Sequence, residues 1–245
     1  MQSPVNLSHA FVRNVTDKRF LYRYNLVLRF KFRETHSQTM SDQKTITTMR
    51  LVGGSPALDF VNTVEMRSDR WGPDLLRTYE DLIEWAVRIE LITGEIGANL
   101  AKAAVSKQSA AENALVAAQD PREAIYSVFQ AEARGRSAPM AQGRVLSDAV
   151  SGALTNRRLS QAGEHFVWMW KEDGFSTIAD RVALEAAELL VTRAQRRPVR
   201  ECLGPYCGWL FIDTSRGGHR RWCADATCGT QMRVKRFRST QAKSA

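Results

Sequence analysis

The chain has 245 residues, which suffices for one large domain or for a medium domain followed by a small one. Its composition is that of an ordinary globular protein, and its net charge is +9 at pH 7. No apolar run approaches the roughly 20 residues that cross a bilayer, and the start of the chain has no secretory pattern. We therefore expect a cytoplasmic protein with no membrane partner.

The positive charge is concentrated in one part of the chain. Residues 193–245 carry twelve lysines and arginines against three acidic residues, whereas residues 50–192 carry fifteen against twenty. A basic segment beside an acidic body indicates a polyanionic partner such as DNA. A basic tail that only improves solubility would explain the same distribution, so the charge alone leaves both interpretations open.

Residues 1–49 differ from the rest of the chain. Residues 26–32 partly alternate apolar and basic side chains, as in an edge strand, and residues 35–48 are polar. Met40 and Met49 are alternative starting points for translation. We expect residues 1–49 to be a poorly structured or mis-started N-terminal extension outside the folded core.

Residues 50–195 carry the pattern of a multihelical domain. Thr78 has the side chain of a helix N-cap, and Asp81 at the third helical position completes a capping box. Asp120 and Pro121 predict a second N-cap followed by proline at the first helical position. Composition and apolar periodicity predict further helices over residues 57–64, 98–119, 145–154 and 178–193.

A short strand is predicted between the last two of these helices. In the run His165–Trp170, aromatic side chains alternate with other residues. This period of two predicts one arm of a small β-hairpin that closes near Asp173 and Gly174. Pro198 would stop the helix that follows, so we expect the boundary between residues 50–195 and a second domain, residues 196–245, near this point.

Asp59, Asn62 and Glu65 are polar residues in an otherwise apolar segment, and on a helix they would share one face. They could line a catalytic pocket, but helix capping and buried hydrogen bonding explain them more simply. The chain shows no nucleophile–base arrangement, phosphate loop or open metal site. We therefore expect a protein that is not an enzyme.

All four cysteines of the chain lie in one segment. Cys202 and Cys207 form one pair, Cys223 and Cys228 form the other, each pair has four intervening residues, and fifteen residues separate the pairs. Two short loops that each supply two thiolates are typical of a structural Zn²⁺ site with four cysteine ligands. Disulfides would need an oxidising compartment, and His219 could replace one cysteine but is not needed.

A basic helix is predicted directly after the second cysteine pair, because residues 230–245 contain neither proline nor glycine. Met232 and Phe237 would pack inward, and the basic side chains would project outward as a phosphate-binding surface. The candidate nucleic-acid-binding residues are Arg220, Arg221, Arg233, Lys235, Arg236 and Arg238.

The cysteines belong to a longer pattern: Trp209-Leu-Phe-Ile-Asp213, Ser215-Arg216, Arg220-Arg221-Trp222-Cys223 and Cys228-Gly229. This pattern resembles the CGNR zinc-finger family. Three upstream runs, residues 57–63, 79–85 and 122–126, resemble the ABATE domain that usually accompanies this finger. The resemblance covers residues 51 to 240 and implies a bacterial, stress-induced transcription regulator with a mostly helical front domain.

The chain departs from the CGNR family at its naming motif. Thr230 and Gln231 stand where the family has asparagine and arginine. The cysteine and glycine on the metal side are kept, so zinc binding should be unaffected. An arginine that could contact a phosphate or a base edge is missing, and Arg233, Lys235 and Arg236 could compensate for it.

These observations predict a mainly α-helical protein. Its multihelical N-terminal domain would include a small β-hairpin, and its small C-terminal domain would hold Zn²⁺ with four cysteines and end in a basic helix. The leading hypothesis is a zinc-dependent, DNA-binding transcription regulator whose helical domain senses a small-molecule ligand or forms a homodimer. The alternative is a protein-interaction or small-molecule-binding module in which the zinc finger is purely structural.

Overall fold

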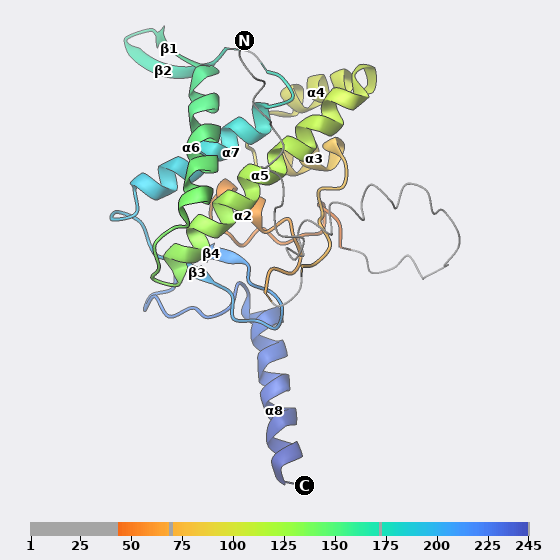
Figure 1. The fold of residues 1–245 in the computed structure, drawn as a ribbon, viewed down its shortest axis with the longest axis vertical. Coiled ribbons are helices and arrows are strands. Elements are labelled where there is room, and N and C mark those ends of the chain that lie inside the picture. Colours follow the sequence, from red (N-terminus) through yellow and green to blue (C-terminus); the bar gives the residue numbers. More distant parts are fainter. Residues whose placement is uncertain (1–43, 69–70, 172, 245) are drawn as a thin grey trace, which may run out of the picture. The chain divides into compact units, whose positions relative to one another are not determined.

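The computed structural model describes residues 44–68, 71–171 and 173–244 (Figure 1). Among these residues the fold is mainly α-helical, as predicted, with two small antiparallel two-stranded sheets. Most of the predicted extension, residues 1–43, lies outside the described residues. None of the described helices combines the length with the apolar composition that a membrane crossing needs.

The first three described helices begin at side-chain caps. Ser55 caps α2 (Pro56–Val61) by accepting a hydrogen bond from the amide of Leu58. Thr78 and Asp81 form the predicted capping box at the start of α3 (Tyr79–Arg88). Thr93 caps α4 (Gly94–Ser106). Each cap satisfies a backbone amide that has no partner inside its own helix.

Helix α5 (Gln108–Ala133) corrects two predicted boundaries. The predicted helix over residues 98–119 is interrupted at Lys107, where α4 ends and α5 begins. Asp120 and Pro121 start no new helix, because Pro121 lies inside α5. A proline there removes one helical hydrogen bond. The helix nevertheless continues, because its flanking turns bury ten side chains against the rest of the molecule.

The predicted β-hairpin is present, but its turn lies on the other side of the predicted strand. It follows α6 (Met140–Thr155) and pairs β1 (Arg157–Ala162) with β2 (His165–Trp170). The turn is Gly163-Glu164, where Gly163 has φ +62°, as the first position of a type II′ turn requires. The chain then continues into α7 (Thr177–Val191).

The cysteine-containing segment adds a second small sheet and the last helix. Strand β3 (Val199–Glu201) pairs with β4 (Leu210–Ile212). A π-helical turn, η1 (Asp225–Gly229), leads directly into α8 (Thr230–Ser244). Among the described elements α8 contacts only η1 (Figure 1).

One core joins the front helices to the cysteine-containing segment. Helix α5 contacts every other helix from α2 to α7 and also β3 and β4 (Figure 1). Ile46 and Met49 are fully buried in this core, so residues 44–49 belong to the folded unit and not to an extension outside it. Val199 and Leu210 from the second sheet lie in the same core.

Candidate metal centre and nucleic-acid interface

The four cysteine side chains converge on one buried point. The sulfur atoms of Cys202, Cys207, Cys223 and Cys228 all lie within 4.8 Å of one another, and none forms a disulfide. The Sγ of Cys223 is 3.7 Å from the Sγ of Cys207 and 3.7 Å from that of Cys228. A tetrahedron with Zn–S bonds of 2.3 Å has sulfur–sulfur edges of about 3.8 Å, so the spacing suits a four-thiolate Zn²⁺ site.

The chemistry of the four thiols also favours a cation. Four thiolates at this distance repel one another unless a cation lies between them. The site is therefore able to bind a metal ion and is consistent with Zn²⁺.

Backbone groups close around the sulfur atoms. The amides of Gly204 and Cys223 donate to the Sγ of Cys202 at 3.4 and 3.2 Å. Such bonds stabilise a thiolate ligand and fix its direction. A Cβ on Gly204 would lie 2.7 Å from the Sγ of Cys228, so only glycine fits at this point of the first loop.

The first cysteine loop is held from outside by the front helices. Tyr206 and Gly208, on either side of Cys207, both have φ near +60°. The amide of Arg67 donates to the carbonyls of Tyr206 (3.1 Å) and Cys207 (2.8 Å), and the amide of Ser68 donates to Tyr206 (3.2 Å). A Cβ on Gly208 would lie 2.9 Å from the amide nitrogen of Ser68. The loop conformation therefore depends on the segment that follows α2.

Arg67 is buried at this junction with its charge compensated. Its guanidinium donates to the carbonyl of Val61 and to the carboxylate of Glu123. It also lies 4.4 Å from the ring centroid of Tyr126 and 4.8 Å from that of Trp71. Burial lowers the pKa of Arg67, and Glu123 acts in the opposite direction. Because the charge is paired and enclosed by two rings, Arg67 stabilises the junction without an unpaired buried charge.

Further buried hydrogen bonds join the same two parts of the chain. Asn62 donates to the carbonyl of Leu210 (2.9 Å) and accepts from its amide (3.0 Å). The indole of Trp209 donates to Val64 (2.8 Å), and the hydroxyl of Tyr126 donates to Gly208 (3.0 Å). The metal centre is thus joined to the helical domain by buried hydrogen bonds.

Asp59, Asn62 and Glu65 do not share a face of one helix, because α2 ends at Val61 and only Asp59 lies within it. Asp59 accepts from the amides of Val52 (3.0 Å) and Gly53 (2.8 Å), and burial raises its pKa to about 6. Asn62 makes the two bonds to Leu210, and Glu65 pairs with Lys44. The contacts of Asp59 and Asn62 agree with buried hydrogen bonding, the simpler of the two interpretations, whereas Glu65 forms a partly exposed ion pair.

Two of the predicted nucleic-acid-binding arginines already form hydrogen bonds or ion pairs with other groups of the finger. Arg220 donates to the carbonyls of Trp222 (2.9 Å) and Cys223, and its guanidinium lies 4.3 Å from the ring centroid of Phe211. Arg233 pairs with Asp225 through two bonds of 2.9 and 3.1 Å, and both side chains are exposed. An exposed pair is weak and can exchange for a phosphate, whereas Arg220 is held by the finger itself.

The other four predicted cations are exposed. Arg221 lies over the ring of Trp222, and Lys235, Arg236 and Arg238 project from α8. None of the four has an ion pair within the described part of the chain. The prediction that Phe237 packs inward is wrong, because its side chain is 64% exposed. Met232 is half-buried.

Sequence reasoning missed Arg67 and Tyr126 as supports of the metal centre. Arg67 lies in a polar, loop-like run, and its partners Glu123 and Tyr206 are far away in the chain. Tyr126 has the signature of an ordinary core residue of a helix. No local signal distinguishes either residue, because their roles arise only when the two parts of the chain meet.

The fold and the cysteine cluster define a zinc-finger protein with a helical front domain. Residues 54–193 match the family model of ABATE, described as "Putative stress-induced transcription regulator", and residues 198–241 match the CGNR zinc finger. The chain therefore belongs to the ABATE family and carries a CGNR zinc finger after the ABATE region, as the sequence patterns predicted. A search of the curated proteins finds no match.

Proposed function

We propose that this protein is a zinc-dependent, DNA-binding transcription regulator whose metal centre has a structural role and no catalytic one. The observation that carries this proposal is the group of exposed cations on and beside α8, namely Arg221, Lys235, Arg236 and Arg238, which have no acidic partner within the described residues. The description of the ABATE family as a transcription regulator supports it.

Zinc would act by holding the basic surface together. Cys228 lies in η1, which leads directly into α8, and Cys223 precedes η1. An ion bound by both residues fixes the direction in which α8 leaves the finger. Four cysteine ligands leave no coordination position for water or substrate, which favours a structural role over catalysis.

The proposal predicts a strong dependence of DNA affinity on salt. Each neutralised phosphate contributes about 0.9 to the slope of log affinity against log salt, so phosphate contacts by two to four of these exposed cations give a slope of about −2 to −4. The measurement is a salt titration of duplex DNA binding with protein of known zinc content, with the chelated protein as control. A DNA affinity that is unchanged after chelation, or that does not depend on salt concentration, would contradict the proposal.

The exposed hairpin favours self-association as a second candidate function. Leu159, Phe166 and Trp168 lie on one face of the hairpin and are 57%, 64% and 56% exposed. Exposed apolar patches of this kind commonly mark interaction surfaces. Strand β2 also contains no lysine, arginine, aspartate or glutamate, the residues that commonly protect an open strand edge.

Among the described residues only β1 pairs with β2, which leaves the other edge of β2 available for pairing with a second copy. The amide of Lys171 donates to the carbonyl of Asn156 (2.8 Å), and hydrogen-bonded pairs alternate along antiparallel strands. The backbone groups of Phe166, Trp168 and Trp170 therefore point away from β1. A register centred on Trp168 places Phe166 of one copy opposite Trp170 of the other.

This candidate predicts a homodimer that a charge on β2 abolishes. Trp168→Lys should convert a dimer into a monomer, because a lysine on each copy would meet at the centre of the shared sheet. Val105→Lys is the matched control, since Val105 is an 85% exposed apolar residue on α4. Light scattering coupled to gel filtration measures the mass. A monomeric unmodified protein, or equal effects of the two variants, rules out this interface.

Ligand sensing by the helical domain stays a prediction.

A further inference from the structure

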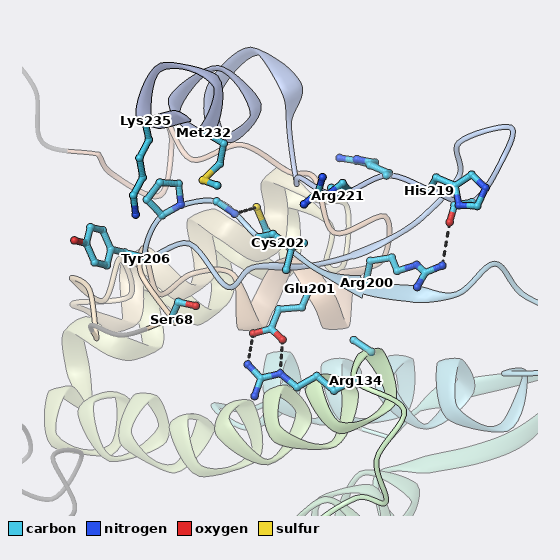
Figure 2. Close-up of a pocket in the computed structure, with 16 residues that line it drawn as sticks. Ser68, Arg134, Arg200, Glu201, Cys202, Tyr206, His219, Arg221, Met232 and Lys235 are labelled. Atoms are coloured by element: carbon cyan, nitrogen blue, oxygen red, sulfur yellow. Dashed lines mark hydrogen bonds and ion pairs between the residues drawn. The ribbon is translucent and has the colours of Figure 1, made fainter. Parts of the chain in front are cut away.

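A groove beside the metal centre is bounded by four parts of the chain. It lies between the end of α5, strand β3 with the first cysteine loop, residues 218–221 and the first turns of α8 (Figure 2). Its volume is about 750 Å³, and it is open to solvent. Helix α8 supplies Met232 and Lys235 on one side (Figure 2). On the other side are Glu201, from β3, and Arg134, which directly follows α5 (Figure 2).

The lining of the groove is strongly basic. Among the described residues that line it, five are cations: Arg134, Arg200, Arg220, Arg221 and Lys235. The same part of the chain supplies one acidic residue, Glu201, and Arg134 donates two hydrogen bonds of 2.6 and 2.8 Å to its carboxylate. A zinc ion with four thiolate ligands carries a charge of about −2. The cations outnumber this charge and that of Glu201 together, so the groove stays positive.

The cations of the groove differ in their availability to a ligand. Arg134 pairs with Glu201, Arg200 donates to the carbonyl of Gly218, and Arg220 donates to backbone carbonyls of the finger. Arg221 and Lys235 have no ion pair within the described part of the chain. They reach the groove from different segments, Arg221 from residues 218–221 and Lys235 from α8.

We propose that the phosphodiester backbone of bound DNA runs through this groove and that Arg221 and Lys235 contact its phosphates. The inference rests on the proposed function and adds the path of the nucleic acid to it. An open groove suits a continuous polymer, whereas small-molecule sites enclose most of their ligand. Arg134, which pairs with Glu201, and Arg200, which lies 3.9 Å from Asp213, add positive potential from the opposite side of the groove without direct contact.

The test compares two double variants that remove the same charge. Arg221→Ala with Lys235→Ala removes two cations from the groove. Arg236→Ala with Arg238→Ala removes two exposed cations of α8 that do not line it. The groove variant should make the slope of log affinity against log salt shallower by about 2, at about 0.9 per lost phosphate contact. The control variant should change it by less than half as much.

The possible results separate the groove from DNA binding itself. Equal effects, or a larger effect of the control variant, would place DNA on the outer face of α8. Such a result would overturn the path through the groove but not the proposal that the protein binds DNA. Failure of the zinc-loaded, unmodified protein to bind DNA at low salt would overturn the proposed function together with the groove. Both variants must keep the zinc content and melting temperature of the unmodified protein.

Two further measurements test charge and ligand source. Arg221→Lys with Lys235→Arg keeps both charges and should keep the salt slope; a slope as shallow as that of the alanine variant would overturn phosphate contact as the cause. Calorimetric titration with inorganic phosphate tests for a small phosphorylated ligand. Tight phosphate binding that the groove variant loses, with unchanged DNA affinity, would also overturn the proposed path.

Discussion

Asn62 connects the end of α2 to the finger through both backbone groups of Leu210. Asn62→Ala would leave a buried amide and a buried carbonyl without partners, which costs about 3 kcal/mol of the free energy of unfolding. Denaturant titration of the zinc-saturated protein measures this loss. Asn113→Ala, on the exposed side of α5, is the control and should change stability by less than about 0.5 kcal/mol. Similar losses in both variants would contradict a structural role for the Asn62 bonds.

Asp59 makes stability depend on pH in a predictable direction. Burial raises its pKa from 3.8 to about 6, despite the hydrogen bonds from Gly53 and Val52. Because the folded pKa is the higher one, protonation favours the folded state; this contribution is complete below pH 3.8 and is lost as the pH rises through 6. Lowering the pH from about 7.5 to about 5 should therefore add about 1 kcal/mol from this group.

The control for Asp59 is Asp59→Asn, which cannot titrate. Comparing the unfolding free energies of the two proteins at each pH cancels the effect of pH on the zinc ligands. A difference between the two proteins that does not change with pH would show that Asp59 titrates alike in the folded and unfolded states.

At the scale of single residues, the sequence predicted roles that depend on local context. Asp59 and Asn62 were recognised as capping or hydrogen-bonding residues because they interrupt an apolar helical segment. The spacing of the four cysteines indicated that they share one ion. Arg67 was missed because its charge is compensated by Glu123, 56 residues away in the chain.

Helix α5 carries a proline that its neighbours tolerate. Pro121→Ala restores a backbone amide to the middle of the helix and also increases the entropy of the unfolded chain, and these effects oppose each other. The net gain in unfolding free energy should be about 1 to 2 kcal/mol, measured by denaturant titration. A loss of stability would mean that the local geometry at Pro121 is needed to place the buried side chains of α5 that follow it, such as Ile125 and Tyr126.

The elements themselves were predicted where they carry their own start and stop signals. The capping box of α3 was found because Thr78 and Asp81 have the required spacing. The interruption at Lys107 was missed because neither glycine nor proline marks it. The hairpin turn was misplaced because Asp173-Gly174 and Gly163-Glu164 are both turn signals, and the partner strand β1 has no clear alternation.

Across the whole molecule, the finger and the helices should unfold together. Residues 44–245 form one compact unit, and the finger shares buried residues with the helical core. We expect one cooperative calorimetric transition in the zinc-loaded protein and a lower melting temperature for all of it after chelation. Two separate transitions, of which only one responds to zinc, would show that the finger is an independent module.

The sequence predicted two adjoining regions but not the contacts by which they pack against each other. Composition, charge and the family patterns all change near residue 195, so the chain resembles a helical domain with a basic tail. The contacts that hold the cysteine-containing segment against the helices join residues 62–68 to residues 206–210. Pairing over such separations depends on the finished shapes of both parts, which no local pattern specifies.

This docking sets an order of events during synthesis. The ribosome completes Asn62 and Val64 long before their partners, which follow 148 and 145 residues later. Until then these polar groups, which follow α2, stay exposed to water or to chaperones. We therefore expect the finger with its metal to join the helices last. A chain that ends early, or that is made in a cell short of zinc, would leave these groups exposed, and we expect such a chain to be degraded faster.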